Sequence, residues 1–208
     1  MPSIWDIDFF NDAKDYIMNK VKTVLNYKFY LMLIFGFERW HLVKFRDREY
    51  AMFLVKALNM LENKSSVLEV GCGLGDILLR LKFSNKTGID ISKNVIQAAK
   101  FLCLFKNFNK SKFRYVCQDI RSRKIDGKYN VIILVNWIHN IDSKELKDIF
   151  KNLYHQNLKT GGTLVFDIVT SKDYQYQHNA QYLIEGLNIN YDIHGPLEYG
   201  RYLVMCQK

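Results

Sequence analysis

The sequence lacks a membrane-spanning segment and a secretory signal. Its longest apolar stretch, Phe29 to Phe37, is well short of the roughly 18 residues that a membrane helix needs. Lys28 and Glu38 flank this stretch, so we expect a buried or partner-facing helix and no membrane insertion. The first ten residues, MPSIWDIDFF, are acidic and lack the charged region and cleavage site of a signal peptide.

Cysteine and proline are also scarce. The four cysteines include no CxxC pair, which argues against a disulfide framework or a zinc site and suits free thiols in a cytoplasmic protein. The two prolines, Pro2 and Pro196, leave the middle of the chain uninterrupted, and there is no internal repeat or linker. At 208 residues, we expect one domain overall around one core.

Basic residues outnumber acidic ones, giving a formal net charge of +9. Much of the excess lies between Lys100 and Lys128, where nine Lys or Arg residues accompany only Asp119 and Asp126. A basic surface attracts phosphates and anionic substrates. A solvated surface in a chain rich in Lys, Asn and Ile is the alternative, and the sequence leaves both interpretations open.

Apolar residues recur at helical spacing in the first 64 residues, from Phe9 to Leu25 and again from Tyr50 to Leu61. An aromatic segment interrupted at Gly36 lies between them. We expect residues 1–64 to form an N-terminal helical lid, whose aromatic helices also offer a surface for a dimer, and residues 65–208 to form the core.

From Ser65 onward, short β-prone runs alternate with helical patterns. The expected strands are 67–70, 87–90, 113–117, 131–135 and 163–169, and the expected helices are 76–82, 93–106 and 143–158. A glycine-rich turn is expected at 159–162. The last two runs, 188–193 and 201–206, are too close for a parallel crossover and predict a hairpin. The predicted fold is α/β, with a seven-stranded, mostly parallel sheet, an antiparallel last strand and helices on both faces.

Three glycines follow the first of these strands. Gly71, Gly73 and Gly75 stand where a buried strand must turn, and glycine permits positive φ and the close approach of a ligand to the backbone. The free N–H groups of a following helix would face that ligand. Glu69 precedes the loop, and the spacing is G-x-G-x-G. Alone, this pattern also fits a structural turn.

Two acidic residues end the next two strands. Asp90 lies 19 residues after Gly71, where a carboxylate can accept hydrogen bonds from both ribose hydroxyls. A helix N-cap is the alternative, but Ser92 already fills that role. Asp119 ends the third strand, where it could recognise adenine or be an ordinary loop acid.

In this order, the segments VLEVGCGLG, TGIDIS, VCQDIR, YNVIILVNWIHNI and LKTGGTLVFDIV resemble the class I S-adenosylmethionine-dependent methyltransferases, over roughly Leu61 to Lys208. The resemblance implies a Rossmann-like core and an enzyme of EC class 2.1.1. It also implies S-adenosyl-L-methionine as the cofactor and S-adenosyl-L-homocysteine as the product. The methyl group of a sulfonium is already activated, so the protein mainly has to align the acceptor.

The resemblance further implies which residues contact the cofactor. The methionine part of the cofactor would be flanked by Gly71, Cys72, Gly73 and Gly75, with Asn136 nearby and Glu69 supporting the loop. The ribose would be held by Asp90, and adenine would pack on Ile91 and meet Asp119 and Ile120 at its edge. The carboxylate of the cofactor would be held by Arg46 and Tyr50.

A hydroxyl acceptor also needs a base, and two histidines are candidates. His139 follows the fourth strand, and His41 lies in the lid beside Trp40. The alternative for His139 is that it only packs or hydrogen-bonds within its loop. Around Asn136 the sequence has neither the Asn-Pro-Pro turn of adenine N-methylating members nor the acidic cluster of metal-assisted ones, so we expect no metal.

The leading hypothesis is methyl transfer to a hydroxyl oxygen of a small acceptor. By analogy with the family, this is a sugar or sugar nucleotide in surface polysaccharide or secondary metabolite biosynthesis. One alternative is an RNA or protein methyltransferase that docks through the basic stretch 100–128. Another is a non-catalytic module that binds the cofactor, or a partner through the aromatic run 27–37.

Overall fold

The computed structural model describes residues 27–106, 111–122 and 124–208. The chain divides into two compact units, residues 1–43 and residues 44–208, and each is described here by itself. None of the described helices is long and apolar enough to cross a membrane.

In the first unit, helix α2 (Tyr27–Phe35) is followed by the short 3-10 helix η1 (Arg39–Leu42). Gly36 has a φ of 69° and its N–H donates to Met32, so α2 ends at the glycine where the sequence predicted an interruption. His41 stacks on Trp40, with ring centres 3.5 Å apart. The helix predicted between Phe9 and Leu25 lies outside the described residues.

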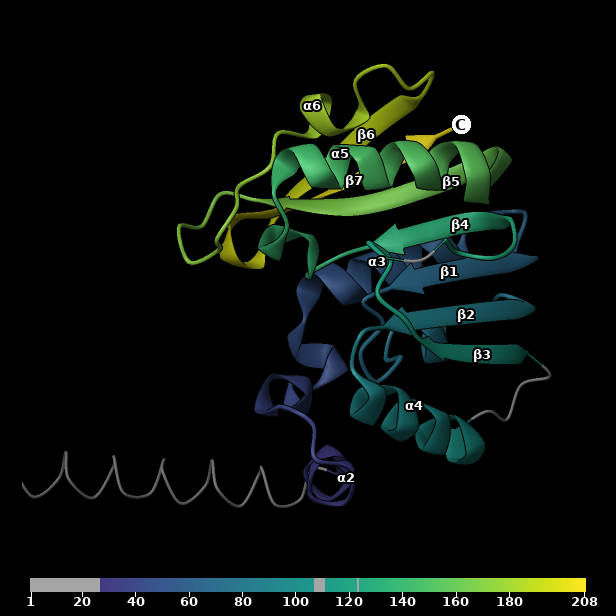
Figure 1. Ribbon diagram of the computed structural model, residues 1–208, viewed down its shortest axis with the longest axis vertical. Helices are drawn as coiled ribbons and strands as arrows, with labels where there is room; N and C mark the ends of the chain where they lie inside the picture. Colours follow the sequence, from purple (N-terminus) through teal and green to yellow (C-terminus); the bar gives the residue numbers. More distant parts are fainter. Residues whose placement is uncertain (1–26, 107–110, 123) are drawn as a thin grey trace, which may run out of the picture. The chain divides into compact units, whose positions relative to one another are not determined.

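The second unit is an α/β core (Figure 1). Its elements, in chain order, are η2 (Phe45–Asp47), α3 (Glu49–Asn59), β1 (Ser66–Val70), η3 (Leu78–Arg80), β2 (Asn85–Asp90), α4 (Lys93–Lys106), β3 (Lys112–Cys117), β4 (Tyr129–Leu134), η4 (Ile138–Asn140), α5 (Ser143–Asn152), η5 (Leu153–Asn157), β5 (Leu158–Val169), α6 (Ala180–Ile184), β6 (Asn190–Leu197), η6 (Glu198–Gly200) and β7 (Arg201–Gln207).

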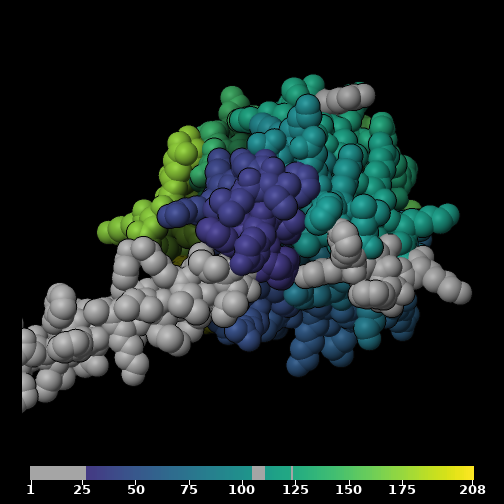
Figure 2. Space-filling model, turned by 90° about the horizontal axis from the view of Figure 1, so that it is seen from below, coloured from purple at the N-terminus to yellow at the C-terminus, as the bar shows by residue number. Residues whose placement is uncertain are grey.

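The sheet has seven strands in the order β3-β2-β1-β4-β5-β7-β6. Strands β1 to β5 pair in parallel, whereas β7 is antiparallel to both β5 and β6. The seven-stranded, mostly parallel sheet with an antiparallel last strand is therefore confirmed, and so is the terminal hairpin. Figure 2 looks onto the edge of this sheet formed by β3, where the teal side chains of β3 and α4 lie at the surface.

Two apolar layers hold helices on opposite faces of the sheet. Every residue of β1 and of β4 is buried, as expected for central parallel strands covered on both sides. Residues of α5 and α6 pack on one face, and residues of α3 and α4 on the other. In Figure 1, α5 lies in front of the sheet and α3 behind it.

Helix α3 belongs to the core in its packing. Its residues Tyr50, Leu54 and Leu58 are buried and join the same apolar cluster as Val67 of β1. The compact unit of the core thus begins at Lys44, earlier in the chain than the boundary at 64 and 65 drawn from the sequence. The lid function of the N-terminal residues stays a prediction.

Two local predictions were wrong. The helix expected at 76–82 is only the 3-10 turn η3, because Leu78, Leu81 and Phe83 are all buried within a segment that must enter β2 at Asn85. The turn expected at 159–162 is part of β5, which begins at Leu158 and has an irregular register against β4 there. The helix expected at 143–158 is α5, and its last turn widens into the π-helix η5.

Candidate functional site

The glycine loop after β1 forms a tight turn at the carboxyl edge of the sheet. Gly71, Gly73 and Gly75 have φ values of 69°, 52° and 74°, a region that side chains disfavour. The N–H of Cys72 donates to the carbonyl of Ile89 on β2, at 3.0 Å. The loop is therefore fixed to the neighbouring strand by its backbone.

Two of these glycines leave room for rings of the protein itself. A Cβ atom on Gly71 would lie 2.3 Å from Cδ1 of Trp137, and one on Gly75 would lie 2.3 Å from the hydroxyl oxygen of Tyr115. The sequence predicted that the glycines would give space to a ligand. The structure adds that Gly71 and Gly75 are required for the packing of the site itself.

Asp90 holds the glycine loop from the end of β2. Its Oδ2 accepts the N–H of Gly73 at 3.0 Å, and its Oδ1 accepts the N–H of Ser92 at 2.9 Å. Ser92 caps α4 through a bond from the N–H of Val95, as predicted. A carboxylate oxygen can accept two hydrogen bonds, so a carboxylate at this position can bond a ligand hydroxyl as well as the backbone. Ile91, the next residue, is exposed.

A charged cluster lies beneath the loop. Glu69 is buried on the face of β1 that it shares with Val67, and burial raises its pKa well above the usual range although Arg48 opposes this shift. Arg48 donates from Nη2 to Oδ2 of Asp76 at 2.5 Å. Arg48 was not predicted from the sequence. The predicted residue, Arg46, has a side chain that is 76% exposed and pairs with its neighbour Asp47.

Asp119 follows the end of β3 and binds Arg121. Nη2 of Arg121 lies 2.7 Å from Oδ2 of Asp119, and this bond holds the pKa of Asp119 below its usual range. Ile120 is partly buried against the apolar layer of α5. The structure thus places both residues at the same edge as Asp90, with the Asp119 carboxylate already engaged.

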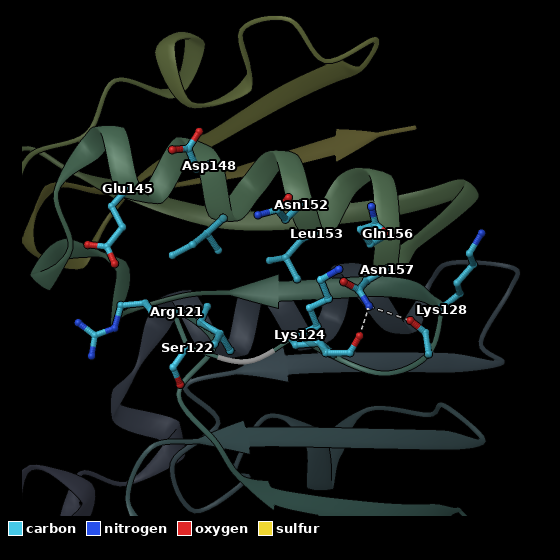
Figure 3. Close-up of a pocket in the computed structure, with 14 residues that line it drawn as sticks. Arg121, Ser122, Lys124, Lys128, Glu145, Asp148, Asn152, Leu153, Gln156 and Asn157 are labelled. Carbon is cyan, nitrogen blue, oxygen red and sulfur yellow. Dashed lines mark hydrogen bonds between the residues drawn. The ribbon is translucent and has the colours of Figure 1, made fainter.

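Next to this segment lies a cavity of about 590 Å³, lined on one side by residues from 120–122 and 124–128 and on the other by helical residues from 145–157 (Figure 3). Asn157 bridges its floor, because its Nδ2 donates to the carbonyls of Ile125 and Gly127, both at 2.9 Å. No residue of the glycine loop lines this cavity, whereas Ile120, one of the predicted adenine contacts, does.

A second buried cluster joins the ends of β4, β5 and β7. Asp167 of β5 accepts the N–H of Asn136 at 2.9 Å, contacts Nε2 of His139 at 3.1 Å and forms an ion pair with Nη1 of Arg201. Arg201 also donates to the hydroxyl of Tyr174 at 2.6 Å. Asp167, Arg201 and Tyr174 were missed from the sequence.

His139 is fully buried in this cluster. Because a carboxylate only accepts hydrogen bonds, the Nε2 that faces Asp167 carries the proton. Burial and the nearby Arg201 cation lower the pKa of His139 to about 4. The ring is therefore neutral at pH 7, and its hydrogen-bond partner Asp167 lies on β5, outside the loop of His139. Whether His139 acts as a base stays a prediction. His41 belongs to the first unit, so its contribution stays a prediction from the sequence.

This pKa predicts how stability depends on pH. The folded state binds a proton on His139 less readily than the unfolded chain does. The contribution of neutral His139 to the free energy of unfolding is therefore complete above the unfolded pKa of 6.5 and is lost as the pH falls toward 4. The loss is about 3 kcal/mol, at 1.36 kcal/mol per pKa unit. Urea unfolding of the wild type and His139→Gln between pH 4 and 7 measures it. An equal pH dependence of both proteins contradicts the prediction, and exposed His155→Gln is the control.

Comparisons with known proteins show what the chain is similar to. Residues 68–164 match the family profile of a methyltransferase domain. A malonyl-[acyl-carrier protein] O-methyltransferase of Acetivibrio thermocellus is 30% identical over 115 residues, 51% of this chain and 37% of that protein. Over residues 68–164 the chain is therefore similar to a methyltransferase domain, in agreement with its resemblance to the class I S-adenosylmethionine-dependent methyltransferases. The chain spans little more than a third of the curated methyltransferase that it matches.

Two solved methyltransferases share the fold. The magnesium protoporphyrin IX methyltransferase ChlM from Synechocystis, with bound SAH, has a TM-score of 0.67 at 15% identity, covering 91% of this chain and 98% of its own. The N-methyltransferase NodS from Bradyrhizobium japonicum, with bound SAH, has a TM-score of 0.64 at 18% identity, covering 78% and 87%. At these identities the likeness concerns the fold of the methyltransferase core.

Unpaired buried atoms around the loop fit the family's cofactor. Four such atoms lack a hydrogen-bond partner among the described residues: Glu69 Oε2, Arg48 Nε, Trp137 Nε1 and Tyr115 Oη. Leaving them unpaired is costly, at about 1–3 kcal/mol each. The amino-acid end of S-adenosylmethionine carries both an ammonium and a carboxylate, and so supplies partners for groups of either sign. No cluster of three or more metal-binding side chains occurs in the described part of the chain.

Proposed function

We propose that this protein transfers a methyl group from S-adenosylmethionine to a hydroxyl oxygen of a small-molecule acceptor. The observation that carries the proposal is the glycine loop pinned to the carboxylate of Asp90 at the carboxyl edge of a methyltransferase sheet. Ligands of open α/β sheets bind at this edge.

Different residues of this chain are proposed to bind different parts of the cofactor. The proposed contacts are Asp90 for the ribose, Ile91, Asp119 and Ile120 for adenine, Gly71, Cys72, Gly73 and Gly75 with Asn136 for the methionine, and Glu69 for the ammonium end. Arg48 replaces Arg46 as the proposed partner of the carboxylate, because it is the arginine that reaches the loop through Asp76. Tyr50, buried beside Arg48, completes this end.

When bound, S-adenosylmethionine supplies an activated methyl group. The protein then contributes alignment, by fixing the acceptor oxygen in line with the bond that breaks, and exclusion of water. A hydroxyl acceptor must also lose its proton. Neutral His139 would serve as the base only for an acceptor that reached its buried ring, and His41 is the second proposal; metal-independent chemistry is proposed as well.

The choice of oxygen as the acceptor atom is supported by one relative, the malonyl-[acyl-carrier protein] O-methyltransferase. A sugar or sugar nucleotide in polysaccharide or secondary metabolite synthesis remains our proposed acceptor. All four cysteines are free thiols, which supports a cytoplasmic location.

Calorimetry and a turnover screen test the function. Titration with S-adenosylmethionine and S-adenosylhomocysteine should show binding of one ligand per chain. The screen then measures release of S-adenosylhomocysteine with sugars, sugar nucleotides, a malonylated carrier protein and RNA. Binding without turnover of any acceptor would favour the non-catalytic alternative, turnover with RNA alone would favour the nucleic-acid alternative, and no binding at all would refute the proposal.

Arg48 and Arg46 provide a matched test of the carboxylate site. Arg48→Met should weaken S-adenosylmethionine binding about 10- to 100-fold, since a hydrogen bond to a charged group is worth about 1.5–3 kcal/mol. Arg46→Met should leave the affinity unchanged, because its side chain is exposed. Asp76→Asn removes the same ion pair while keeping Arg48, and its smaller effect would separate ligand contact from loop support. Equal affinities of Arg48→Met and Arg46→Met contradict the assignment.

A further inference from the structure

The ion pair between Asp167 and Arg201 is buried at the carboxyl edge of the sheet. Asp167 has no exposed surface and Arg201 is 2% exposed. Asp167 lies near the end of β5, and Arg201 begins β7, the antiparallel neighbour of β5. The pair is therefore placed beside the end of β4, where the chain turns toward the glycine loop.

Both members of the pair hold the same residue. Asp167 accepts the backbone N–H of Asn136 at 2.9 Å, and Arg201 donates to the side-chain Oδ1 of Asn136 at 3.2 Å. The fork of the guanidinium makes this possible, because it reaches Asp167, Asn136 and the Tyr174 hydroxyl together.

Asn136 needs this support because of its backbone conformation. Its φ is 75°, and Tyr199 is the only other described residue besides glycine with a positive φ. For an L-residue the left-handed region costs about 1–2 kcal/mol, although Asn tolerates it better than most. The next residue, Trp137, fills the space over Gly71. The conformation of Asn136 thus directs the indole onto the glycine loop.

A buried ion pair is a weak source of stability. Desolvation of two charges often offsets their attraction, and well-packed apolar residues in their place are often as stable or more so. Stability alone therefore does not explain a pair at this position. Strained residues held by their surroundings occur where a ligand must meet a preformed shape.

We propose that the Asp167–Arg201 pair is a positioning device. It holds Asn136 in the left-handed conformation and, through Trp137, sets the glycine loop in the geometry that binds the cofactor. Neither member of the pair touches the cofactor or the acceptor. This inference rests on the proposed function, and it assigns to β5 and β7 a part in shaping the cofactor site.

The test removes the pair and asks whether the effect passes through Asn136. Asp167→Asn/Arg201→Met takes away both charges, so no buried ion is left without a partner. The expected result is a folded protein whose affinity for S-adenosylmethionine is about tenfold lower, equal to about 1.4 kcal/mol. In an Asn136→Gly background, the left-handed turn needs no support. There the same double change should lower the logarithm of the affinity for S-adenosylmethionine by at most half as much as in the wild type.

Tryptophan fluorescence measures the conformation of the turn at Asn136 and Trp137 without any cofactor. In a Trp5→Phe/Trp40→Phe background, Trp137 is the only tryptophan, and removal of the pair should shift its emission to the red as the indole leaves Gly71. If the wild type does not bind S-adenosylmethionine, the proposed function fails, while this measurement still decides the inference.

Controls separate positioning from general damage. Lys147→Met/Glu185→Gln deletes a more exposed ion pair between α5 and the residue after α6, and should change neither affinity nor emission. If the double variant does not fold, Arg201→Lys is used, because it keeps the charge but cannot bond Asp167, Asn136 and Tyr174 together. Unchanged emission, or equal affinity losses with Asn136 and with Gly at that position, would overturn the proposal.

Discussion

Asp90→Ala is expected to lower the affinity for S-adenosylmethionine by about 100-fold. The variant has no carboxylate to accept hydrogen bonds from the two ribose hydroxyls, and each hydrogen bond to a charged group is worth about 1.5–3 kcal/mol. The variant also releases the N–H groups of Gly73 and Ser92, which Asp90 accepts at 3.0 and 2.9 Å. Calorimetry at constant ionic strength measures the change directly.

Matched variants separate the two functions of this carboxylate. Asp90→Asn keeps the shape and one acceptor oxygen, so a loss of about tenfold is expected from the charge and one bond. Asp126→Ala removes the same charge from a side chain that is 82% exposed, and should have no effect. An Asp90→Ala protein that is folded and binds with wild-type affinity would refute the assignment of Asp90 to the cofactor.

Cys117 provides a second readout of the same prediction. It ends β3 directly beside Asp90 in the strand register, its thiol is exposed, and its Sγ lies 3.4 Å from the carbonyl oxygen of Ile91. S-adenosylmethionine should slow the alkylation of Cys117 in the wild type and have no effect in Asp90→Ala. The half-buried Cys103 on α4 serves as the internal reference.

The sheet was predictable because its central strands are short, continuous apolar runs. In β1 and β4 every residue is buried, so burial on both faces leaves a plain signal in the sequence. The glycine loop and Asp90 were predictable for a related reason. Both must stand at the carboxyl end of a parallel strand, and strand ends can be located once the runs are known.

The choice of Arg48 over Arg46 was not predictable. The two arginines are separated by one residue, and which of them faces the loop depends on the short turn η2 before α3. Local spacing carries no information on this choice. The outcome is set by Asp76, which lies 28 residues away in the chain.

The buried cluster around Asp167 is only weakly indicated by the sequence. An acid within the apolar run LVFDIV indicates a buried charge that needs a partner. The partner itself, Arg201, lies in the last strand, and its identity follows only from the pairing of β5 with β7. The sequence therefore indicates that Asp167 needs a cation but not which residue supplies it.

Gly75→Ala is expected to lower the free energy of unfolding by about 2–5 kcal/mol. The left-handed backbone alone costs about 1–2 kcal/mol in an L-residue, and overpacking of a buried site adds about 1–3 kcal/mol. The new methyl group would lie 2.3 Å from the Tyr115 hydroxyl and 3.0 Å from the ring carbon that carries it, so the ring must move. Urea unfolding followed by circular dichroism measures the loss.

Gly161→Ala isolates the backbone contribution. Gly161 has a φ of 70°, close to the 74° of Gly75, but a Cβ there would meet nothing within 4 Å. The Gly161→Ala protein should lose about 1–2 kcal/mol of unfolding free energy. Any larger loss in Gly75→Ala therefore measures the clash with Tyr115. Adding Tyr115→Phe to Gly75→Ala removes the clashing hydroxyl and should restore part of that excess, while the backbone cost stays. If Gly75→Ala and Gly161→Ala lose the same stability, the ring of Tyr115 does not fill the space at Gly75, and the glycine there serves the turn alone.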